Sequence, residues 1–236
     1  MPVVSETFRQ WVIEDHFRFP RPDLDKVDVI FAADVSPFED MKIKLLNGGH
    51  SGLAYVASLA QYEYVHEAIA NVSVYNFVKS YMEYDARPSL DSTPGIDLDD
   101  YIDTLVERFA NVAIADKVER LCGDGISKLS NFLAPVAKDS IVAERSLERI
   151  AIIYAAYFHY IKRAVDYCDD AKYGLYEPQV DAQTLKRYSQ NPLSLLQRLG
   201  IEGENSKLTG LILENIQRIE ENGVMPILNE EVLAHV

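Results

Sequence analysis

The sequence predicts a mainly α-helical fold, a bundle of several helices preceded by a short extended segment. The strongest indication is residues 146–168, SLERIAIIYAAYFHYIKRAVDYC, where apolar side chains recur every three or four positions and the middle is apolar on its other face too. Such a helix normally lies at the centre of a bundle. Residues 50–70 predict a second long apolar helix, whereas only residues 27–35, VDVIFAADV, have the composition of a convincing strand.

Residues 1–40 are expected to form an extended segment packed on the helical domain. Pro20 and Pro22 favour extended or turn backbone on either side of the sequence FPRP. The predicted strand at 27–35 follows, and the turn-forming sequence SPFED ends it. The N-terminal part of the chain is therefore expected to lack long helices.

Residues 41–236 are expected to form the helical domain. After the apolar helix at 50–70, a further helix is expected to stop before Pro88. Another is expected to begin after Pro94, because three aspartates near its N-terminus interact favourably with the helix dipole. Two or three shorter amphipathic helices are expected between Pro192 and Val236.

Composition narrows the class of function. The net charge of −14 and the pI near 4.7 disfavour nucleic acid and anionic membrane surfaces as partners. No apolar run approaches 18 residues, and charges interrupt the N-terminal sequence, so neither a transmembrane helix nor a signal peptide is predicted. Cys122 and Cys168 form no CxxC pair, which favours inert thiols and a reducing, cytoplasmic setting.

The familiar nucleotide and hydrolase motifs are missing from the sequence. No GxGxxG follows a strand, and the glycines of residues 48–52 have the wrong spacing for one. No P-loop, HExxH or GxSxG occurs either. By its own motifs the chain is expected to bind no nucleotide. No metal is expected, because the five histidines lack the tight spacing with carboxylates typical of a zinc site.

The sequence MKIKLLNGGHSG, residues 41–52, gathers three side chains that could share one task. Asn47 and His50 are three residues apart and would share a helix face, and the long side chain of Lys42 could reach the same point. A suitably placed lysine can act as a general base, and an amide can donate to a developing oxyanion. Gly48 and Gly49 would then leave room for a ligand or another backbone. The alternative is that Lys42 is a solvated charge and Asn47 an ordinary helix cap.

A second candidate cluster is RLCGDGISK, residues 120–128. Arg120 and Lys128 are about two helical turns apart and could point the same way, although Asp124-Gly125 indicates a break or turn. Two cations beside one cavity would suit a polyhydroxylated or anionic substrate. The alternative is that Arg120 pairs with nearby acids such as Glu119 or Asp124.

Taken together, these clusters resemble the mannitol 2-dehydrogenase family of long-chain polyol dehydrogenases, together with the related fructuronate and tagaturonate reductases. The resemblance is carried by Lys42-x4-Asn47-x2-His50 and by ERFANVAIADKVERLCGDGISK, and it extends to SETFRQWVIED, RPDLDKVDVIF, KLLNGGHSGLAYV and PGIDLDDYIDTLVERF. It implies a helical fold like the C-terminal domain of mannitol dehydrogenase, of the 6-phosphogluconate dehydrogenase C-terminal type. It further implies that the N-terminal Rossmann NAD(P)-binding domain of the family is absent from this chain.

The resemblance also implies roles for five residues. Lys42 would be the general base that takes the proton from a secondary hydroxyl of mannitol or a similar polyol as hydride leaves for the nicotinamide. Asn47 would stabilise the oxyanion, and His50 would hydrogen-bond the reacting oxygen or a neighbouring hydroxyl. Arg120 and Lys128 would bind the other hydroxyls. NAD or NADP would be bound mainly by the Rossmann domain, so no cofactor-binding residue is assigned, and the isolated chain is expected to be inactive.

Two alternatives remain open from the sequence. A uronate reductase such as a fructuronate reductase would differ only in substrate, and its carboxylate would sit well between Arg120 and Lys128. A non-catalytic helical interaction module would use an exposed apolar surface instead, for which FRQWVIEDHF is a candidate. The presence of all five site residues favours the enzyme.

Overall fold

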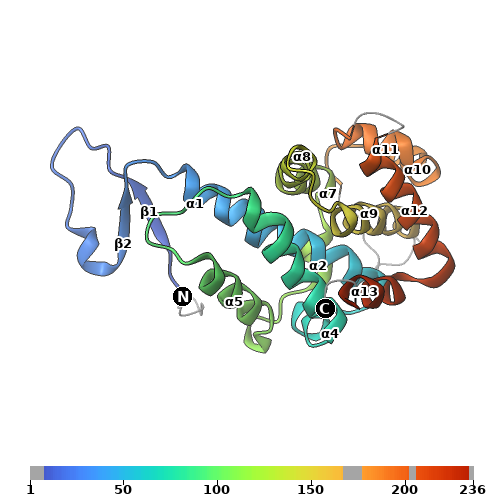
Figure 1. The fold of residues 1–236 in the computed structure, drawn as a ribbon, viewed down its shortest axis with the longest axis horizontal. Helices are drawn as coiled ribbons and strands as arrows, with labels where there is room; N and C mark the ends of the chain where they lie inside the picture. The colour runs from blue at the N-terminus through green and yellow to red at the C-terminus, as the bar shows by residue number, and fades with distance from the viewer. Residues whose placement is uncertain (1–7, 167–176, 202–205, 234–236) are drawn as a thin grey trace.

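The computed structural model describes residues 8–166, 177–201 and 206–233, and most of these residues are helical. Figure 1 shows an elongated molecule with a small sheet at one end and helices α10, α11 and α12 at the other. A long helical segment built from α1 and α2 runs from the sheet into the helical body. The predicted fold class, mainly α with a short extended N-terminal segment, is confirmed.

The sheet contains two parallel strands, β1 (Trp11–Glu14) and β2 (Val29–Ala32). Trp11 pairs with Val29 and Glu14 with Ala32. The strand predicted at 27–35 is therefore shorter than expected: the 3-10 turn η1 (Leu24–Val27) precedes it, and Asp28 adopts a left-handed conformation with φ 66°. Strand β1 was not predicted, because its partner lies across a long connection.

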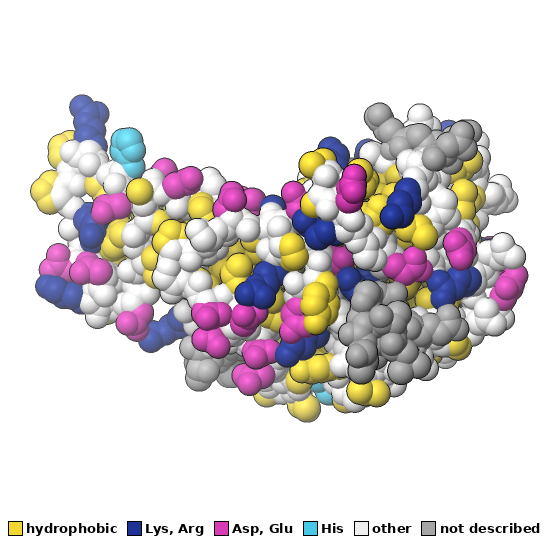
Figure 2. All heavy atoms as spheres, in the orientation of Figure 1, with side chains coloured by type: hydrophobic (Ala, Val, Ile, Leu, Met, Phe, Trp, Pro, Cys, Tyr) yellow, Lys and Arg dark blue, Asp and Glu magenta, His cyan; other side chains and the backbone are white. Residues whose placement is uncertain are grey.

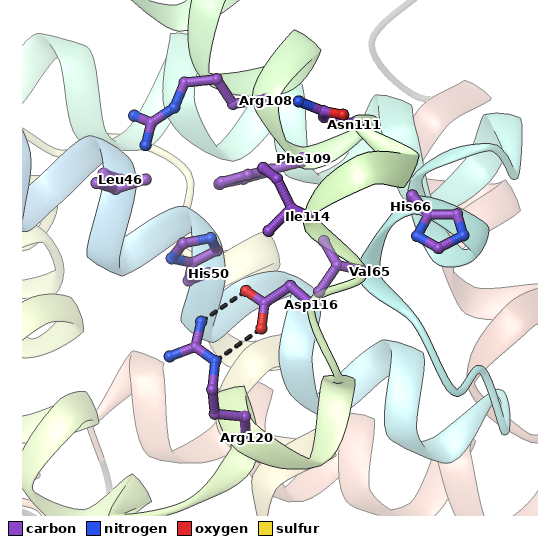
Figure 3. Close-up of a pocket in the computed structure, with 10 residues that line it drawn as sticks. All are labelled: Leu46, His50, Val65, His66, Arg108, Phe109, Asn111, Ile114, Asp116 and Arg120. Carbon is purple, nitrogen blue, oxygen red and sulfur yellow. Dashed lines mark hydrogen bonds and ion pairs between the residues drawn. The ribbon is translucent and has the colours of Figure 1, made fainter. Parts of the chain in front are cut away.

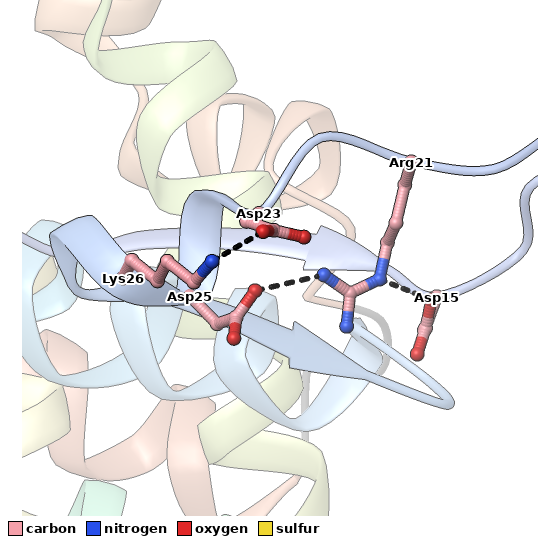
Figure 4. Close-up of polar contacts among 5 residues, drawn as sticks. All are labelled: Asp15, Arg21, Asp23, Asp25 and Lys26. Atoms are coloured by element: carbon pink, nitrogen blue, oxygen red, sulfur yellow. Dashed lines mark hydrogen bonds and ion pairs between the residues drawn. The ribbon is translucent and has the colours of Figure 1, made fainter.

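An arginine on the connection between the strands holds that connection together (Figure 4). Arg21 donates from Nε to Asp15 at 3.2 Å and from a terminal nitrogen to Asp25 at 3.1 Å. Its guanidinium also lies over the ring of Phe31, 3.5 Å from the ring centroid. These contacts fix the loop against β2.

The chain then enters one continuous helical run of three parts: α1 (Ser36–Met41), the π-helical segment η2 (Lys42–Asn47) and α2 (Gly48–Leu59). Pro37 lies in the first turn, where proline is tolerated. Asn47 has helical dihedral angles and caps nothing, so the alternative that Asn47 starts a helix is wrong. The helix predicted at 50–70 is interrupted near Gln61, whose φ is 66°, and resumes as α3 (Val65–Ile69).

The next helices follow the expected order. Asn71 caps α4 (Val72–Ser80), which continues as the π-helical segment η3 (Tyr81–Ala86) and a 3-10 turn η4 (Arg87–Ser89) that contains Pro88. Asp97 caps α5 (Leu98–Phe109) by accepting from the N–H groups of residues 99 and 100. Beyond α5 come η5 (Val112–Ile114), α6 (Val118–Cys122), α7 (Gly125–Lys128), η6 (Leu129–Leu133) and α8 (Ala134–Val142).

Helix α9 (Glu148–Asp166) is the centre of the bundle, as predicted, and the side chains from Arg149 to Ile161 are buried. It packs against α2, α10 (Ala182–Gln190) and α12 (Lys207–Asn222). The C-terminal region also contains α11 (Pro192–Arg198) and α13 (Val224–Leu233), so the expected short helices after Pro192 are confirmed. Among the described residues, no helix has the length and apolar character needed to cross a membrane.

One buried ion pair joins α9 to η3. Arg149 donates from Nε to Asp85 at 2.6 Å, and the two side chains are only 2% and 1% exposed. Cys122 is a buried free thiol whose pKa is raised by burial to about 12, which fits the expected inert role. Cys168 lies outside the described residues.

The two adjacent glycines of α2 leave room for side chains of η3. A Cβ on Gly48 would overlap the hydroxyl of Tyr81, and one on Gly49 would overlap the end of Met82. The expectation that these glycines admit a ligand or a backbone is therefore wrong for this chain. Buried side chains already fill the space.

Replacing Gly48 with alanine is expected to destabilise the protein by about 1–3 kcal/mol, because the buried Tyr81 ring must move. Gly210 in α12 is the matched control, since a Cβ there meets nothing within 4 Å. Gly210→Ala is expected to stabilise by roughly 0.5–1 kcal/mol, because alanine favours the helix. Urea denaturation of both variants measures the difference, and equal effects would contradict the packing assigned to Gly48.

Candidate active site

The π-helical segment η2 brings Lys42 and Asn47 to the same side of the long helix. In an α-helix, residue i+5 lies about 140° away from residue i, given 3.6 residues per turn. In a π-helix, the i→i+5 hydrogen bond closes the turn, so residue i+5 returns above residue i. Gly48 donates such a bond to the carbonyl of Ile43. Lys42 is exposed and makes no ion pair or hydrogen bond with the described part of the chain, whereas Asn47 is half-buried.

His50 lies one turn further along, at the edge of a pocket. Its ring stacks on Phe109 with centroids 4.3 Å apart and an interplanar angle of 25°. Burial lowers the pKa of His50 to about 4, opposed by the charge of Asp116 and reinforced by Arg120, Arg108 and Lys128. The imidazole is therefore neutral at pH 7. It hydrogen-bonds no described residue, so its nitrogens are available to a ligand.

The pocket has a volume of about 210 Å³ and is shown in Figure 3. Its polar lining includes Arg108 of α5 and Arg120 of α6, and its apolar lining includes Phe109 of α5. The lining residues are Leu46, His50, Val65, His66, Arg108, Phe109, Asn111, Ile114, Asp116 and Arg120. A concave, partly apolar cavity with a few convergent polar groups is the usual form of a small-molecule site.

Arg120 reaches this pocket as half of a two-bonded ion pair. Its Nε donates to one carboxylate oxygen of Asp116 at 2.7 Å, and a terminal nitrogen donates to the other at 2.6 Å. Hydrogen bonding to Arg120 lowers the pKa of Asp116, so the pair is charged. The partners anticipated for Arg120, Glu119 or Asp124, were wrong: the guanidinium pairs with Asp116, in the loop just before α6.

The backbone fixes the position of Asp116. Its carbonyl accepts from Val65 at 2.9 Å, and the N–H of Val118 donates to Glu63 at 3.0 Å. Tyr64 and Lys117 form an antiparallel bridge between these bonds. The break between α2 and α3 therefore holds the loop that carries Asp116, and through it Arg120.

Lys128 belongs to the next short helix. The expected break occurs at Asp124, whose φ is 56°, so α6 and α7 are separate helices. The ammonium of Lys128 folds back and donates to the carbonyl of Leu121 at 2.8 Å. Burial lowers the pKa of Lys128, and its charge contributes to the lowered pKa of His50.

The structure thus brings His50 and Arg120 to one pocket, which Lys128 does not line. Lys42 and Asn47 lie on the adjoining turns and do not line it. Sequence reasoning missed Asp116 and Phe109, although the i, i+4 spacing of Asp116 and Arg120 was a usable signal. Within the described ranges, no group of three or more His, Cys, Asp or Glu side chains could hold a metal ion.

The comparisons with known proteins agree on one family. The family model described as the mannitol dehydrogenase C-terminal domain matches residues 34–183. A mannitol 2-dehydrogenase of Aspergillus fumigatus is 42% identical over 168 residues, which cover 70% of this chain and 34% of that protein. One of Emericella nidulans is 33% identical over 242 residues, covering 98% of this chain and 47% of that protein.

Two solved structures share the fold. The Pseudomonas fluorescens mannitol 2-dehydrogenase in ternary complex with NAD and D-mannitol has a TM-score of 0.83 and 37% identity, over 95% of this chain and 46% of its own. A substrate-free D-sorbitol dehydrogenase has a TM-score of 0.82 and 31% identity, over 92% of this chain and 46% of its own. The chain therefore spans about a third to a half of the length of the relatives it matches. On this evidence the chain belongs to the mannitol dehydrogenase family, whose C-terminal domain it matches.

Proposed function

We propose that this chain is the substrate-binding and catalytic half of an NAD(P)-dependent polyol 2-dehydrogenase that interconverts mannitol, or a similar polyol, and its ketose. The observation that carries the proposal is the pocket shared by His50 and Arg120, which adjoins the helix bearing Lys42 and Asn47. Membership of the mannitol dehydrogenase family supports it.

In this proposal each side chain acts on a stated atom of the substrate. Lys42 takes the proton of the reacting hydroxyl, and the amide of Asn47 donates to the oxygen that becomes negative. Neutral His50 holds that oxygen or a neighbouring hydroxyl. The N–H donors of Arg120 not used by Asp116, together with Lys128, bind the remaining hydroxyls.

The Asp116–Arg120 pair favours a neutral polyol over a uronate. Asp116 already neutralises Arg120, and the ammonium of Lys128 is engaged with Leu121. A substrate carboxylate would meet the charge of Asp116 beside a cation that is already paired. A hydroxyl would lose nothing, because it can both accept from the guanidinium and donate to the carboxylate.

The test is a substrate comparison in the holoenzyme, that is, this chain combined with a dinucleotide-binding half. The value of kcat/KM for fructose reduction is expected to exceed that for fructuronate reduction by more than about tenfold, a difference of about 1.4 kcal/mol. A preference for fructuronate would overturn the polyol assignment. In Asp116→Asn the ratio of the two kcat/KM values should fall, because removal of the Asp116 charge should improve binding of the fructuronate carboxylate.

The cofactor would be held by a separate dinucleotide-binding domain. NAD or NADP supplies the hydride acceptor when bound, but the connection from β1 to β2, residues 15–28, contains no glycine to cradle its phosphates. A parallel sheet of only two strands is normally completed by further strands, and helices normally cover its two faces. Figure 2 shows hydrophobic side chains at the surface of the strand end of the molecule. Those exposed there include Phe8, Trp11, Phe17 and Phe19.

Trp11, the only tryptophan of the chain, should report docking of that domain. It is 59% exposed, so its fluorescence in the isolated chain is expected to be red-shifted and readily quenched by acrylamide. Adding the dinucleotide-binding half as a separate polypeptide should shift the emission to the blue and protect it from the quencher. An unchanged spectrum in a complex confirmed by light scattering would place the contact elsewhere.

A further inference from the structure

The two cations of the pocket region depend on a sharp break in the chain. Arg120 lies on α6 and Lys128 on α7, and the left-handed Asp124 turns one helix away from the other. Helix α7 is the first turn of a helical run that continues through η6 into α8, and its first N–H groups have no partner within the helix. The place of Lys128 relative to Arg120 therefore requires support for this first turn.

That support comes from a carboxylate distant in the sequence. Glu177 is buried and accepts from the N–H of Gly125 at 2.7 Å and from the N–H of Ile126 at 3.3 Å. The hydroxyl of Tyr157 donates to the same carboxylate at 2.8 Å. Glu177 thus satisfies the free N–H groups at the start of α7 and ties them to the central helix α9.

Other side chains also pack against the break at Asp124-Gly125. A Cβ on Gly125 would overlap the rings of Tyr157 and Tyr55, so the loop lies directly on two buried tyrosines. Ser127 donates to Asp124 at 2.9 Å and accepts from the amide of Gln179, two residues beyond Glu177. The loop is therefore held between rigid rings and the segment 177–179.

The buried position of Glu177 disfavours the charged form of its carboxyl group. Burial raises the pKa of Glu177, against the three hydrogen bonds that lower it. A carboxyl group held where burial disfavours its charge is more typical of functional regions than of ordinary surface. Two of the contacts of Glu177 are with the start of α7, beside the break that separates the two cations, and the third is with Tyr157 of α9.

We propose that Glu177 is a positioning residue of the substrate site: it fixes α7 so that Lys128 is held at a set place relative to Arg120 and the pocket. The expected effect of Glu177 on substrate binding rests on the proposed function. The placement of Lys128 by Glu177 does not depend on that function. When Glu177 is replaced, α7 loses its support and the ammonium of Lys128 leaves the carbonyl of Leu121.

The first measurement uses the chain alone. Glu177→Gln keeps the size of the side chain but replaces one accepting oxygen by a donor that faces an N–H. The rate of acetylation of Lys128 by acetic anhydride, followed by mass spectrometry, is expected to rise several-fold. Glu148→Gln is the matched control, because Glu148 is a half-buried glutamate that joins α9 to α12 through Arg218 and Asn215. It should lower stability without changing the labelling of Lys128.

The second measurement uses the holoenzyme. Glu177→Gln is expected to raise KM for the polyol about tenfold, which matches the loss of a hydrogen bond to a charged group, with kcat little changed. Combined with Lys128→Met, it should add almost nothing, because the residue that it positions is gone. Glu148→Gln should leave KM unchanged.

The outcomes separate the two proposals. Unchanged labelling of Lys128 in Glu177→Gln, or additive effects of Glu177→Gln and Lys128→Met on KM, would overturn the positioning role. Faster labelling combined with no polyol turnover by the unsubstituted holoenzyme would support the positioning of Lys128 and reject the proposed function instead.

Discussion

Lys42→Ala in the holoenzyme is expected to lower kcat for polyol oxidation by about 10²–10⁴-fold, the usual contribution of a general base. The proposed role of Lys42 is to take the hydroxyl proton, and the described part of the chain offers no partner that ties its ammonium elsewhere. Cofactor affinity should be nearly unchanged, because in the proposed function the dinucleotide is bound by the other domain. Steady-state kinetics and NAD titration measure the two quantities.

Lys44 supplies the matched control on the same π-helical segment. Its ammonium lies 3.4 Å from Asp40 and donates to the carbonyl of Ser89 at 2.8 Å, so it serves the packing of the long helix. Lys44→Ala is expected to lower stability and to leave kcat within about threefold of the original value. A loss of less than tenfold in Lys42→Ala would remove Lys42 from the role of base.

Arg149→Met is expected to lower the free energy of unfolding by about 3–5 kcal/mol, the largest effect on stability foreseen for a single residue of this chain. Arg149 and Asp85 are almost completely buried, so the substitution leaves a carboxylate charged and desolvated beside the core. Their contact joins the central helix to η3, whose Tyr81 and Met82 pack on the glycines of α2. Urea denaturation of the chain measures the change.

Two further variants test the reason for that loss. Replacing both partners, Asp85→Leu with Arg149→Met, should recover most of the stability, because no buried charge remains. Arg9→Met breaks an ion pair whose partners are 76% and 81% exposed, and it should cost less than about 1 kcal/mol. If the double variant were as unstable as the single one, packing and not charge would explain the role of Arg149.

The helices of this fold were predictable because their apolar periodicity is local. The apolar stripe of α9 and the aspartate N-cap of α5 each depend only on residues within one short segment of the sequence. Strand β1 was missed because a parallel pair depends on contacts across a long connection, here between Trp11 and Val29. The π-helical form of Lys42–Asn47 was missed because sequence periodicity distinguishes a helix from a strand, and not one helical form from another.

The site residues likewise divide into those with a local sequence signal and those without one. Lys42, Asn47, His50, Arg120 and Lys128 were assigned through spacings that resemble a family, and their catalytic roles stay predictions. Asp116 could have been found from its spacing of four residues to Arg120, a spacing at which opposite charges often pair. Glu177 could not, because it is 52 residues from the N–H group of Gly125 that it accepts from, and no local pattern connects them.

The most direct test of the central claim is reconstitution from separate halves. This chain, a dinucleotide-binding half of the family, and the two together are each given mannitol and NAD, and formation of NADH is followed by absorbance. Mannitol-dependent NADH is expected only from the mixture, and none when the mixture contains the Lys42→Ala chain. NADH formed by this chain alone, or no NADH from halves shown to associate, would contradict the assignment of this chain as the substrate-binding and catalytic half of a polyol dehydrogenase.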